Sequence, residues 1–267
     1  MARASDVSLR YPTFVVIGAM RSGTTSFHAL LRSHPEVFMS PIKGPGLFVD
    51  PTEAIRYPSK YESLAEKRGN RSDAELLAEL ARDRSEEKHF GEATDLYTRF
   101  PAVRSDVPGK MLRCNPGMKL IYLVRHPVKR ILSQFRFERT KPLNPLPGRL
   151  AEYLRFSPDA LSTSRYYLQL SRFLAAGFRR EQVHIIVFEE LVRDPRRQFE
   201  RVCRFLDISF VGPALFPHLN ATPPSARQDS RNGLSRSQLK KLDSLLRPDV
   251  HRLEDFVGRR IDIWSLG

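Results

Sequence analysis

The fold is decided by the stretch Tyr11-Pro-Thr-Phe-Val-Val-Ile-Gly-Ala-Met-Arg-Ser-Gly-Thr-Thr-Ser26. Residues 14–17 are an unbroken apolar run, as expected of a strand buried on both faces of a parallel sheet. Gly18 and Gly23 allow a tight turn, and the pattern predicts a helix over Thr25–Arg32. The free amides and positive dipole end of that helix would face the turn, so the stretch predicts a phosphate or sulfate site.

The turn differs from the loop of nucleotide triphosphatases. Its G-x-x-x-x-G spacing matches a Walker A loop, but Thr24 stands where those proteins have lysine. The cation lies inside the loop instead, as Arg21. The alternative is a glycine turn with a structural role alone, which the string Arg-Ser-Gly-Thr-Thr-Ser directly after a buried strand disfavours.

A second strand, turn and helix predict a second anion site. The segment 119–135 reads Lys-Leu-Ile-Tyr-Leu-Val-Arg-His-Pro-Val-Lys-Arg-Ile-Leu-Ser-Gln-Phe. A Walker-type ATPase would end this strand in Asp to hold magnesium, whereas this chain has Arg125. Arg125 and Ser133 could clamp one phosphate, while Lys129 and Arg130 are typical of a solvated helix face. Two cationic sites without that carboxylate indicate a multiply charged ligand bound without metal.

The remaining pattern predicts an α/β fold with a central parallel sheet flanked by helices in three layers, in one domain over residues 1–267 with its core at 11–264. Further strands are expected at Leu120–Val124, Val183–Phe188 and, more weakly, Lys88–Ala93. Helices are expected at Ala74–Arg82, Pro127–Phe137, Ser164–Ala176, Pro195–Leu206 and Ser235–Leu246. Segments 41–60, 140–149 and 209–234 are expected to be loops that contact substrate.

Composition narrows the class of partner. The 267 residues carry 44 − 30 = +14 charges, which favours a polyanionic ligand. No recognition-helix motif supports nucleic acid. The apolar runs are far shorter than the ~20 residues that span a bilayer, and the first ten residues do not resemble a secretory signal. We therefore expect a cytoplasmic protein whose Cys114 and Cys203 are free thiols.

The two anion motifs together resemble those of the PAPS-dependent sulfotransferase superfamily, whose donor is 3'-phosphoadenosine 5'-phosphosulfate. The match is nearest to the carbohydrate (heparan-type) and bacterial branch and extends over about residues 11–264. Further similar landmarks are Gly91-Glu-Ala-Thr-Asp-Leu-Tyr97, Ser164-Arg-Tyr-Tyr-Leu-Gln-Leu170, Val187-Phe-Glu-Glu-Leu-Val-Arg-Asp-Pro195, Arg204-Phe-Leu206 and Arg252-Leu-Glu-Asp-Phe-Val-Gly258 before Trp264.

This resemblance implies the ligand contacts. The 5'-phosphosulfate would lie on the loop residues Arg21, Ser22, Gly23, Thr24, Thr25 and Ser26. The 3'-phosphate would lie on Arg125 and Ser133, under a basic lid formed by Arg231, Asn232 and Gly233. Arg21 and Lys43 would neutralise charge on the bridging oxygen during transfer, with no metal required.

The chain departs from the family where the catalytic base is expected. The heparan-type branch has P-x-K-E-x-x-F-F after the first helix, and here Gly44 replaces that Glu. Glu92 is the first alternative base, because it is expected at the carboxyl end of a central strand, and Asp95 and His89 are further candidates. Glu92 could instead be a structural carboxylate paired with Arg or Lys, and His89 could be an ordinary, partly buried histidine.

We therefore expect a sulfotransferase that moves a sulfuryl group from PAPS to a hydroxyl or amine of a glycan or small metabolite, releasing PAP. The alternative is a catalytically impaired or inactive protein that binds PAPS, PAP or an acidic glycan, as Gly44 suggests. A P-loop kinase is disfavoured by Thr24 and Arg125. The acceptor's identity and the oligomeric state stay open.

Overall fold

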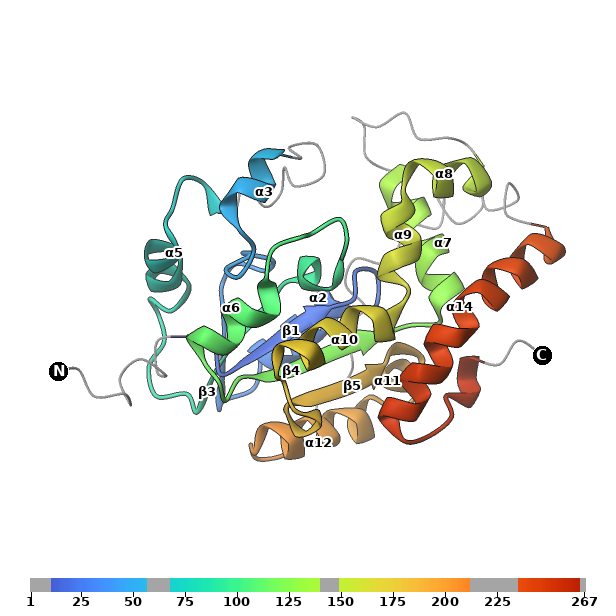
Figure 1. Ribbon diagram of the computed structural model, residues 1–267. Helices are drawn as coiled ribbons and strands as arrows, with labels where there is room; N and C mark the ends of the chain where they lie inside the picture. Colours follow the sequence, from blue (N-terminus) through green and yellow to red (C-terminus); the bar gives the residue numbers. More distant parts are fainter. Residues whose placement is uncertain (1–10, 57–67, 140–148, 212–234, 265–267) are drawn as a thin grey trace.

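The computed structural model describes residues 11–56, 68–139, 149–211 and 235–264. Within them, five parallel strands form one sheet in the order β2-β3-β1-β4-β5. The strands are β1 (Phe14–Gly18), β2 (Val37–Met39), β3 (His89–Ala93), β4 (Lys119–Val124) and β5 (Val183–Val187). The sheet lies at the centre of the molecule, with helices on both faces (Figure 1). This confirms the predicted α/β architecture.

The strand order places a ligand-binding crevice beside β1. The chain moves to one side of β1 for β2 and β3 and to the other side for β4 and β5. In open parallel sheets, ligands bind at the carboxyl ends of the strands where this reversal occurs. The carboxyl ends of β1, β3 and β4 lead into Arg21, Asp95 and Arg125, so the fold gathers the predicted site residues at one edge.

The helices connect these strands and extend beyond the sheet. They are α2 (Thr24–Arg32), α3 (Pro51–Arg56), α5 (Asp73–Leu80), α6 (Val107–Cys114), α7 (Pro127–Arg139), α8 (Leu150–Phe156), α9 (Pro158–Thr163), α10 (Tyr166–Ala176), α11 (Phe188–Arg193), α12 (Pro195–Leu206) and α14 (Arg236–Val257), with short 3₁₀ turns η1 (Asp95–Thr98), η2 (Arg180–Gln182) and η4 (Asp262–Trp264).

Two apolar clusters explain the layers. One face of the sheet packs against α5, α6, α10 and the end of α14, through side chains such as Leu76, Met111 and Phe173. The other face packs against α2, α11 and α12, through side chains such as Phe27 and Phe199. A third cluster joins α7, α8, α9 and α14. Burial of this kind gives roughly 1.5–3 kcal/mol per large side chain.

The sequence missed several elements. The strand β2 was not predicted, because three residues are too few to show a pattern, and α6, α8, α9 and α11 were also missed. The predicted loop 41–60 contains α3. The last helix runs to Val257 rather than ending at Leu246, since it continues through Pro248. Most of the predicted loops 140–149 and 209–234 lies outside the described residues, as do Arg231, Asn232 and Gly233.

Candidate active site

The phosphate loop turns into α2 through two residues with left-handed backbone conformation. Arg21 has φ +66° and Gly23 has φ +87°. Gly23 is the N-cap of α2, and no side chain caps that end. A Cβ added at Gly23 would lie 2.7 Å from the Phe188 ring, so only glycine fits this turn. The amides that follow are therefore presented at the carboxyl edge of the sheet.

The structure brings the two predicted anion motifs together around Arg21. Its Nε donates to Ser133 Oγ on α7 at 3.2 Å, and its guanidinium lies 4.4 Å from the centre of the Phe137 ring. Arg125 Nη1 donates to the Arg21 carbonyl oxygen at 3.2 Å. Burial, and then the charge of Arg125, lowers the pKa of Arg21. The crowded cations favour a ligand that brings negative charge.

Arg125 is oriented by aromatic side chains. Tyr166 donates its hydroxyl proton to the Arg125 carbonyl oxygen at 2.6 Å and accepts from the Arg125 amide at 3.2 Å. The guanidinium lies 5.0 Å from the centre of the Phe188 ring. Within the described part of the chain, Arg125 Nε is buried without a hydrogen-bond acceptor. A buried donor of this kind has a strong preference for an acceptor, which a phosphate oxygen would supply.

Arg130 corrects one expectation from the sequence. It was expected on a solvated helix face, but it is fully buried. Its Nε donates to Ser164 Oγ at 2.5 Å, its Nη1 donates to Gln134 Oε1 at 2.7 Å, and its Nη2 donates to the Ala160 carbonyl. Arg130 therefore joins α7 to α9. Lys129 is exposed, as expected.

Replacing Tyr166 by phenylalanine tests the support of Arg125. The change removes both hydrogen bonds to the Arg125 peptide, each worth about 0.5–1.5 kcal/mol. We expect affinity for PAP to fall roughly three- to ten-fold, measured by calorimetry, with the melting temperature recorded alongside. Tyr167→Phe, at the neighbouring position, is the matched control. Equal affinities of the two variants would show that the Tyr166 hydroxyl does not orient Arg125.

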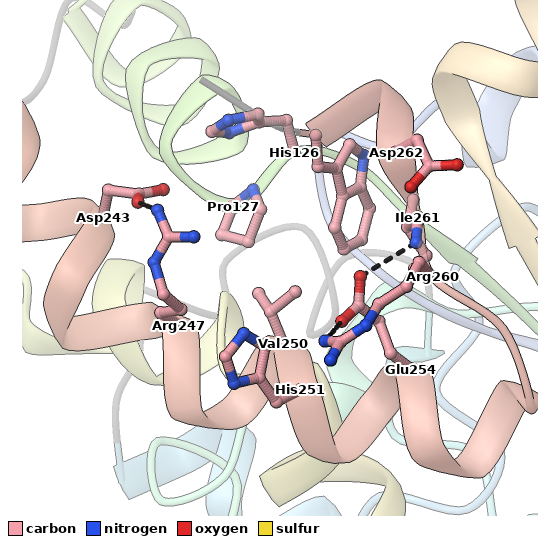
Figure 2. Close-up of a pocket in the computed structure, with 11 residues that line it drawn as sticks. His126, Pro127, Asp243, Arg247, Val250, His251, Glu254, Arg260, Ile261 and Asp262 are labelled. Carbon is pink, nitrogen blue, oxygen red and sulfur yellow. Dashed lines mark hydrogen bonds and ion pairs between the residues drawn. The ribbon is translucent and has the colours of Figure 1, made fainter. Parts of the chain in front are cut away.

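The C-terminal segment braces the same turn from behind. Trp264 Nε1 donates to Glu189 Oε2 at 2.9 Å, and Glu189 Oε1 accepts from the His126 amide at 3.0 Å. Glu189 thus joins the C-terminal segment to the turn after β4. Beside it lies a cavity of about 340 Å³ between the β4–α7 turn and α14 (Figure 2). Two ion pairs line this cavity, Asp243 with Arg247 and Glu254 with Arg260, and each joins two residues of the lining.

The loop that carries Lys43 is fixed to β3. Gly44 N donates to the Ala93 carbonyl oxygen at 2.7 Å, and Gly44 has φ +74°. The backbone conformation therefore favours glycine at position 44, because a left-handed conformation costs other residues roughly 1–2 kcal/mol. A glutamate at this position would destabilise the loop by that amount. The position of Gly44 beside the end of β3 also places it next to the Glu92–Asp95 segment.

The candidate bases lie in different surroundings. Glu92 has no exposed surface, and Thr94 Oγ1 donates to its Oε2 at 2.9 Å. Burial raises the pKa of Glu92 to about 7, against hydrogen bonds from Tyr97 and Thr94 and the charge of Lys43. Asp95 is half-buried, and its charge acts on Arg21. Asp95 is thus the carboxylate that an acceptor could contact directly.

His89 lies at the other end of β3. Its Nδ1 is 3.0 Å from Thr13 Oγ1, and burial lowers its pKa. This end of the parallel strands is opposite the phosphate loop, so His89 is not brought together with the other candidates. It corresponds to the partly buried histidine that the sequence left as its alternative.

Glu92 also predicts a pH-dependent stability. Its pKa is about 7 in the folded chain, against the ordinary value of 4.5 for an exposed glutamate. The folded chain thus retains a proton that the unfolded chain releases, so this stability is complete below pH 4.5 and is lost as the pH rises to about 7. The loss is on the order of 3 kcal/mol. We expect the isosteric change Glu92→Gln to raise the melting temperature at about pH 8 and barely alter it at about pH 4.5.

Two variants provide the reference for that measurement. Glu86→Gln changes an exposed site. Within each buffer, it should melt at the same temperature as the wild-type chain. A gain for Glu92→Gln that is equal in the acidic and the alkaline buffer would contradict a pKa near 7, because the benefit must grow with ionisation of the native carboxyl.

Residues 11–56, 68–139, 149–211 and 235–264 contain no group of three or more His, Cys, Asp or Glu side chains that could hold a metal ion. In the same part of the chain, no helix combines the length and the apolar character needed to cross a bilayer.

Comparison with known proteins identifies the class that this geometry defines. Residues 12–211 match the Sulfotransferase family, so the chain belongs to that family. Its fold matches a sulfotransferase from Alicyclobacillus acidocaldarius with a TM-score of 0.73 and 25% identity, over 95% of this chain and 98% of the other. The sulfotransferase domain from the curacin biosynthetic pathway matches with a TM-score of 0.52 and 15% identity, over 87% and 96%.

A curated relative is similar over a shorter stretch. The membrane-associated sulfotransferase kil1 of Dictyostelium discoideum is 30% identical over 126 residues. This stretch is 47% of the chain and 23% of that relative's own length. The family and the fold are thus shown, and the recognition made from the Arg21 and Arg125 motifs is confirmed. The described fold is that of this family.

The sequence alone did not reveal the residues that support the site. Tyr166 and Phe188 orient Arg125, and Thr94 and Tyr97 contact both Glu92 and the Lys43 loop. Each lies in a landmark segment of the resemblance, so the segments were found but the roles were not. A hydroxyl's partner depends on tertiary placement, which spacing along the chain does not show.

Proposed function

We propose that the protein transfers a sulfuryl group from PAPS to a hydroxyl or amine of an acceptor. The single observation that carries this proposal is the cluster of Arg21, Arg125 and Ser133 at the uncapped end of α2. A donor with a 5'-phosphosulfate and a separate 3'-phosphate has one anionic group for the loop and one for Arg125. ATP has no 3'-phosphate.

The donor contacts are proposed from the family resemblance, and this geometry supports them. The loop residues bind the 5'-phosphosulfate, and they are Arg21, Ser22, Gly23, Thr24, Thr25 and Ser26. Arg125 and Ser133 bind the 3'-phosphate. Arg231, Asn232 and Gly233, proposed from the family resemblance as a lid, lie outside the described residues. Charge-assisted hydrogen bonds of this kind are about twice as strong as neutral ones.

The transfer itself would be an in-line displacement at sulfur. The acceptor oxygen or nitrogen forms a bond to sulfur as the bond from sulfur to the bridging phosphate oxygen breaks, and PAP leaves with the electron pair. Arg21, the loop amides and Lys43 stabilise the charge that develops on that oxygen. Asp95, which is half-buried and whose charge acts on Arg21, accepts the proton of the acceptor. No metal is needed in this scheme.

The acceptor is proposed as a glycan or a small metabolite. Arg-rich surroundings favour an acidic glycan, because guanidinium groups bind carboxylate and sulfate through two hydrogen bonds. The second candidate function is a protein that binds PAP or an acidic glycan with little or no turnover, and the glycine at position 44 favours it. We propose the transferase, since a carboxylate remains available at Asp95.

Ligand-induced stabilisation tests the donor. We expect PAP at a hundred-fold excess over its Kd to stabilise the fold by ~2.7 kcal/mol, and ATP with magnesium to do much less. Thermal melting with each nucleotide measures this, and a heparin fragment serves as the third arm. Equal stabilisation by PAP and ATP would exclude the assignment of the 3'-phosphate site. A shift with heparin but with neither nucleotide would support the glycan-binding alternative.

A further inference from the structure

The loop 40–49, which carries Lys43, is attached to β3 through its backbone. Ser40 N donates to the Gly91 carbonyl oxygen at 2.8 Å, and Gly44 N donates to the Ala93 carbonyl oxygen at 2.7 Å. His28 on α2 adds a contact from its Nε2 to the Ser40 carbonyl oxygen at 3.1 Å. The start of the loop thus follows the strand that contains Glu92.

Two hydroxyl groups continue this attachment beyond the end of β3. Gly46 N donates to Thr94 Oγ1 at 3.2 Å, and Phe48 N donates to the Tyr97 hydroxyl at 3.3 Å. A hydroxyl that accepts from an amide still has one proton to donate. The Thr94 proton goes to Glu92 Oε2 at 2.9 Å, and Tyr97 also hydrogen-bonds Glu92. The two hydroxyl groups that hold the loop therefore both hydrogen-bond the same carboxyl group, that of Glu92.

The far side of the loop is held by cations. Arg68 Nη1 donates to the Gly46 and Val49 carbonyl oxygens at 3.2 and 3.4 Å, and Lys110 Nζ donates to the Leu47 carbonyl oxygen at 3.1 Å. These contacts fix the backbone between Gly46 and Val49. The Gly46 and Phe48 amides in the same stretch donate to Thr94 and Tyr97, so both sets of contacts act on the backbone that follows Lys43.

Glu92 is enclosed by this arrangement. Its exposed fraction is zero. The titratable groups that act on it are Tyr97, from η1, and Lys43, from the loop itself. A group with no exposed surface cannot touch an acceptor, whereas it can set the position and the electrostatic surroundings of Lys43. Misplacement of a catalytic group by about 1 Å can cost on the order of 10²-fold in rate.

We propose that Glu92 is a positioning residue, which holds the loop 40–49 through Thr94 and Tyr97 and thereby places Lys43 at the sulfuryl group. The role assigned to Lys43 rests on the proposed function. The attachment of the loop does not, because it follows from contacts within the chain. The two parts are tested separately.

Hydrogen exchange tests the attachment without any turnover. Glu92→Gln replaces the carboxylate by a neutral amide oxygen, which accepts from Thr94 and Tyr97 less strongly than an ionised carboxylate does at about pH 8. We expect the Gly46 and Phe48 amides to exchange roughly ten-fold faster, an opening easier by about 1.4 kcal/mol. Glu86→Gln, an exposed control, should leave them unchanged. Unchanged exchange in Glu92→Gln would overturn the proposal.

A double-mutant cycle tests the action through Lys43. With PAPS as donor and a desulfated heparin fragment as acceptor, we expect Glu92→Gln to lower kcat about ten-fold with PAP affinity kept. In a Lys43→Met background the same change should add less than about two-fold, since residues that act as a unit are not additive. Thr94→Val should repeat this pattern.

The outcomes separate the possibilities. A loss of ~10²–10⁴-fold in Glu92→Gln that persists in the Lys43→Met background would make Glu92 the base and overturn the positioning role. Wild-type kcat in Glu92→Gln would also overturn it. If no variant and not even the wild type transfers sulfate, the proposed function fails while the hydrogen-exchange result still decides the attachment of the loop.

Discussion

Replacement of Asp95 by asparagine is expected to lower kcat by ~10²–10⁴-fold, the usual contribution of a general base. Asparagine keeps the shape of the side chain but cannot accept the acceptor's proton. Asp95 is half-buried at the carboxyl end of β3, next to the charge of Arg21. Because the donor contacts lie on the phosphate loop and α7, PAP affinity should change little. Steady-state kinetics and calorimetry measure the two quantities.

Matched variants make that result specific. Asp83→Asn changes an exposed carboxylate far from the site and should retain full activity, and Asp95→Glu should recover part of the lost rate. If Asp95→Asn keeps its kcat, the base is another group, and Glu92→Gln becomes the deciding variant. Full activity in both variants would require an acceptor that is already deprotonated at neutral pH.

Replacement of Arg125 by alanine is expected to weaken PAP binding by about 1.5–3 kcal/mol, or roughly ten- to 150-fold. The guanidinium is the charged partner proposed for the 3'-phosphate, and its buried Nε has no acceptor within the described residues. Ser133→Ala should cost less, since it removes a neutral hydrogen bond. Arg21 loses a contact with Ser133 in that variant, so the fold should be checked by melting.

The 3'-phosphate itself provides the control. Adenosine 5'-phosphosulfate lacks this group, so its affinity should be nearly the same for wild type and Arg125→Ala. An equal loss for both ligands would disprove the pairing. Lys129→Ala removes an exposed cation from α7, which begins two residues after Arg125, and it should have a small, salt-dependent effect. This separates a specific contact from the general attraction of a basic surface.

The sequence predicted the central strands of the sheet better than it predicted the edge strand and the helices around the sheet. The buried runs at 14–17, 120–124 and 183–188 became β1, β4 and β5 because a strand covered on both faces must be apolar throughout. The weaker run 88–93 became β3. The edge strand β2, with three residues, has too little pattern to be seen. The helix α14 continued through Pro248 because packing outweighed the local cost of proline.

The candidate site shows a similar division. Motif spacing predicted that Arg21, Arg125 and Ser133 lie near one another, and in the structure Arg21 contacts both of the others. Exposure could not be predicted in this way. Arg130 was expected in solvent and is buried, while Glu92 was expected to face the ligand and has no exposed surface. Which side of an element meets solvent depends on segments that are distant along the chain, such as α9 for Arg130 and the loop 40–49 for Glu92.

The open end of α2 has a further consequence. Gly23 is its N-cap and no side chain closes that end, so the amides of the first turn lack a side-chain acceptor, which would add roughly a few tenths of a kcal/mol over glycine. The donor's phosphosulfate would serve as that missing acceptor. Binding would then complete the secondary structure of the chain, and the first turn of α2 would fray in the empty protein and become firm in the loaded one.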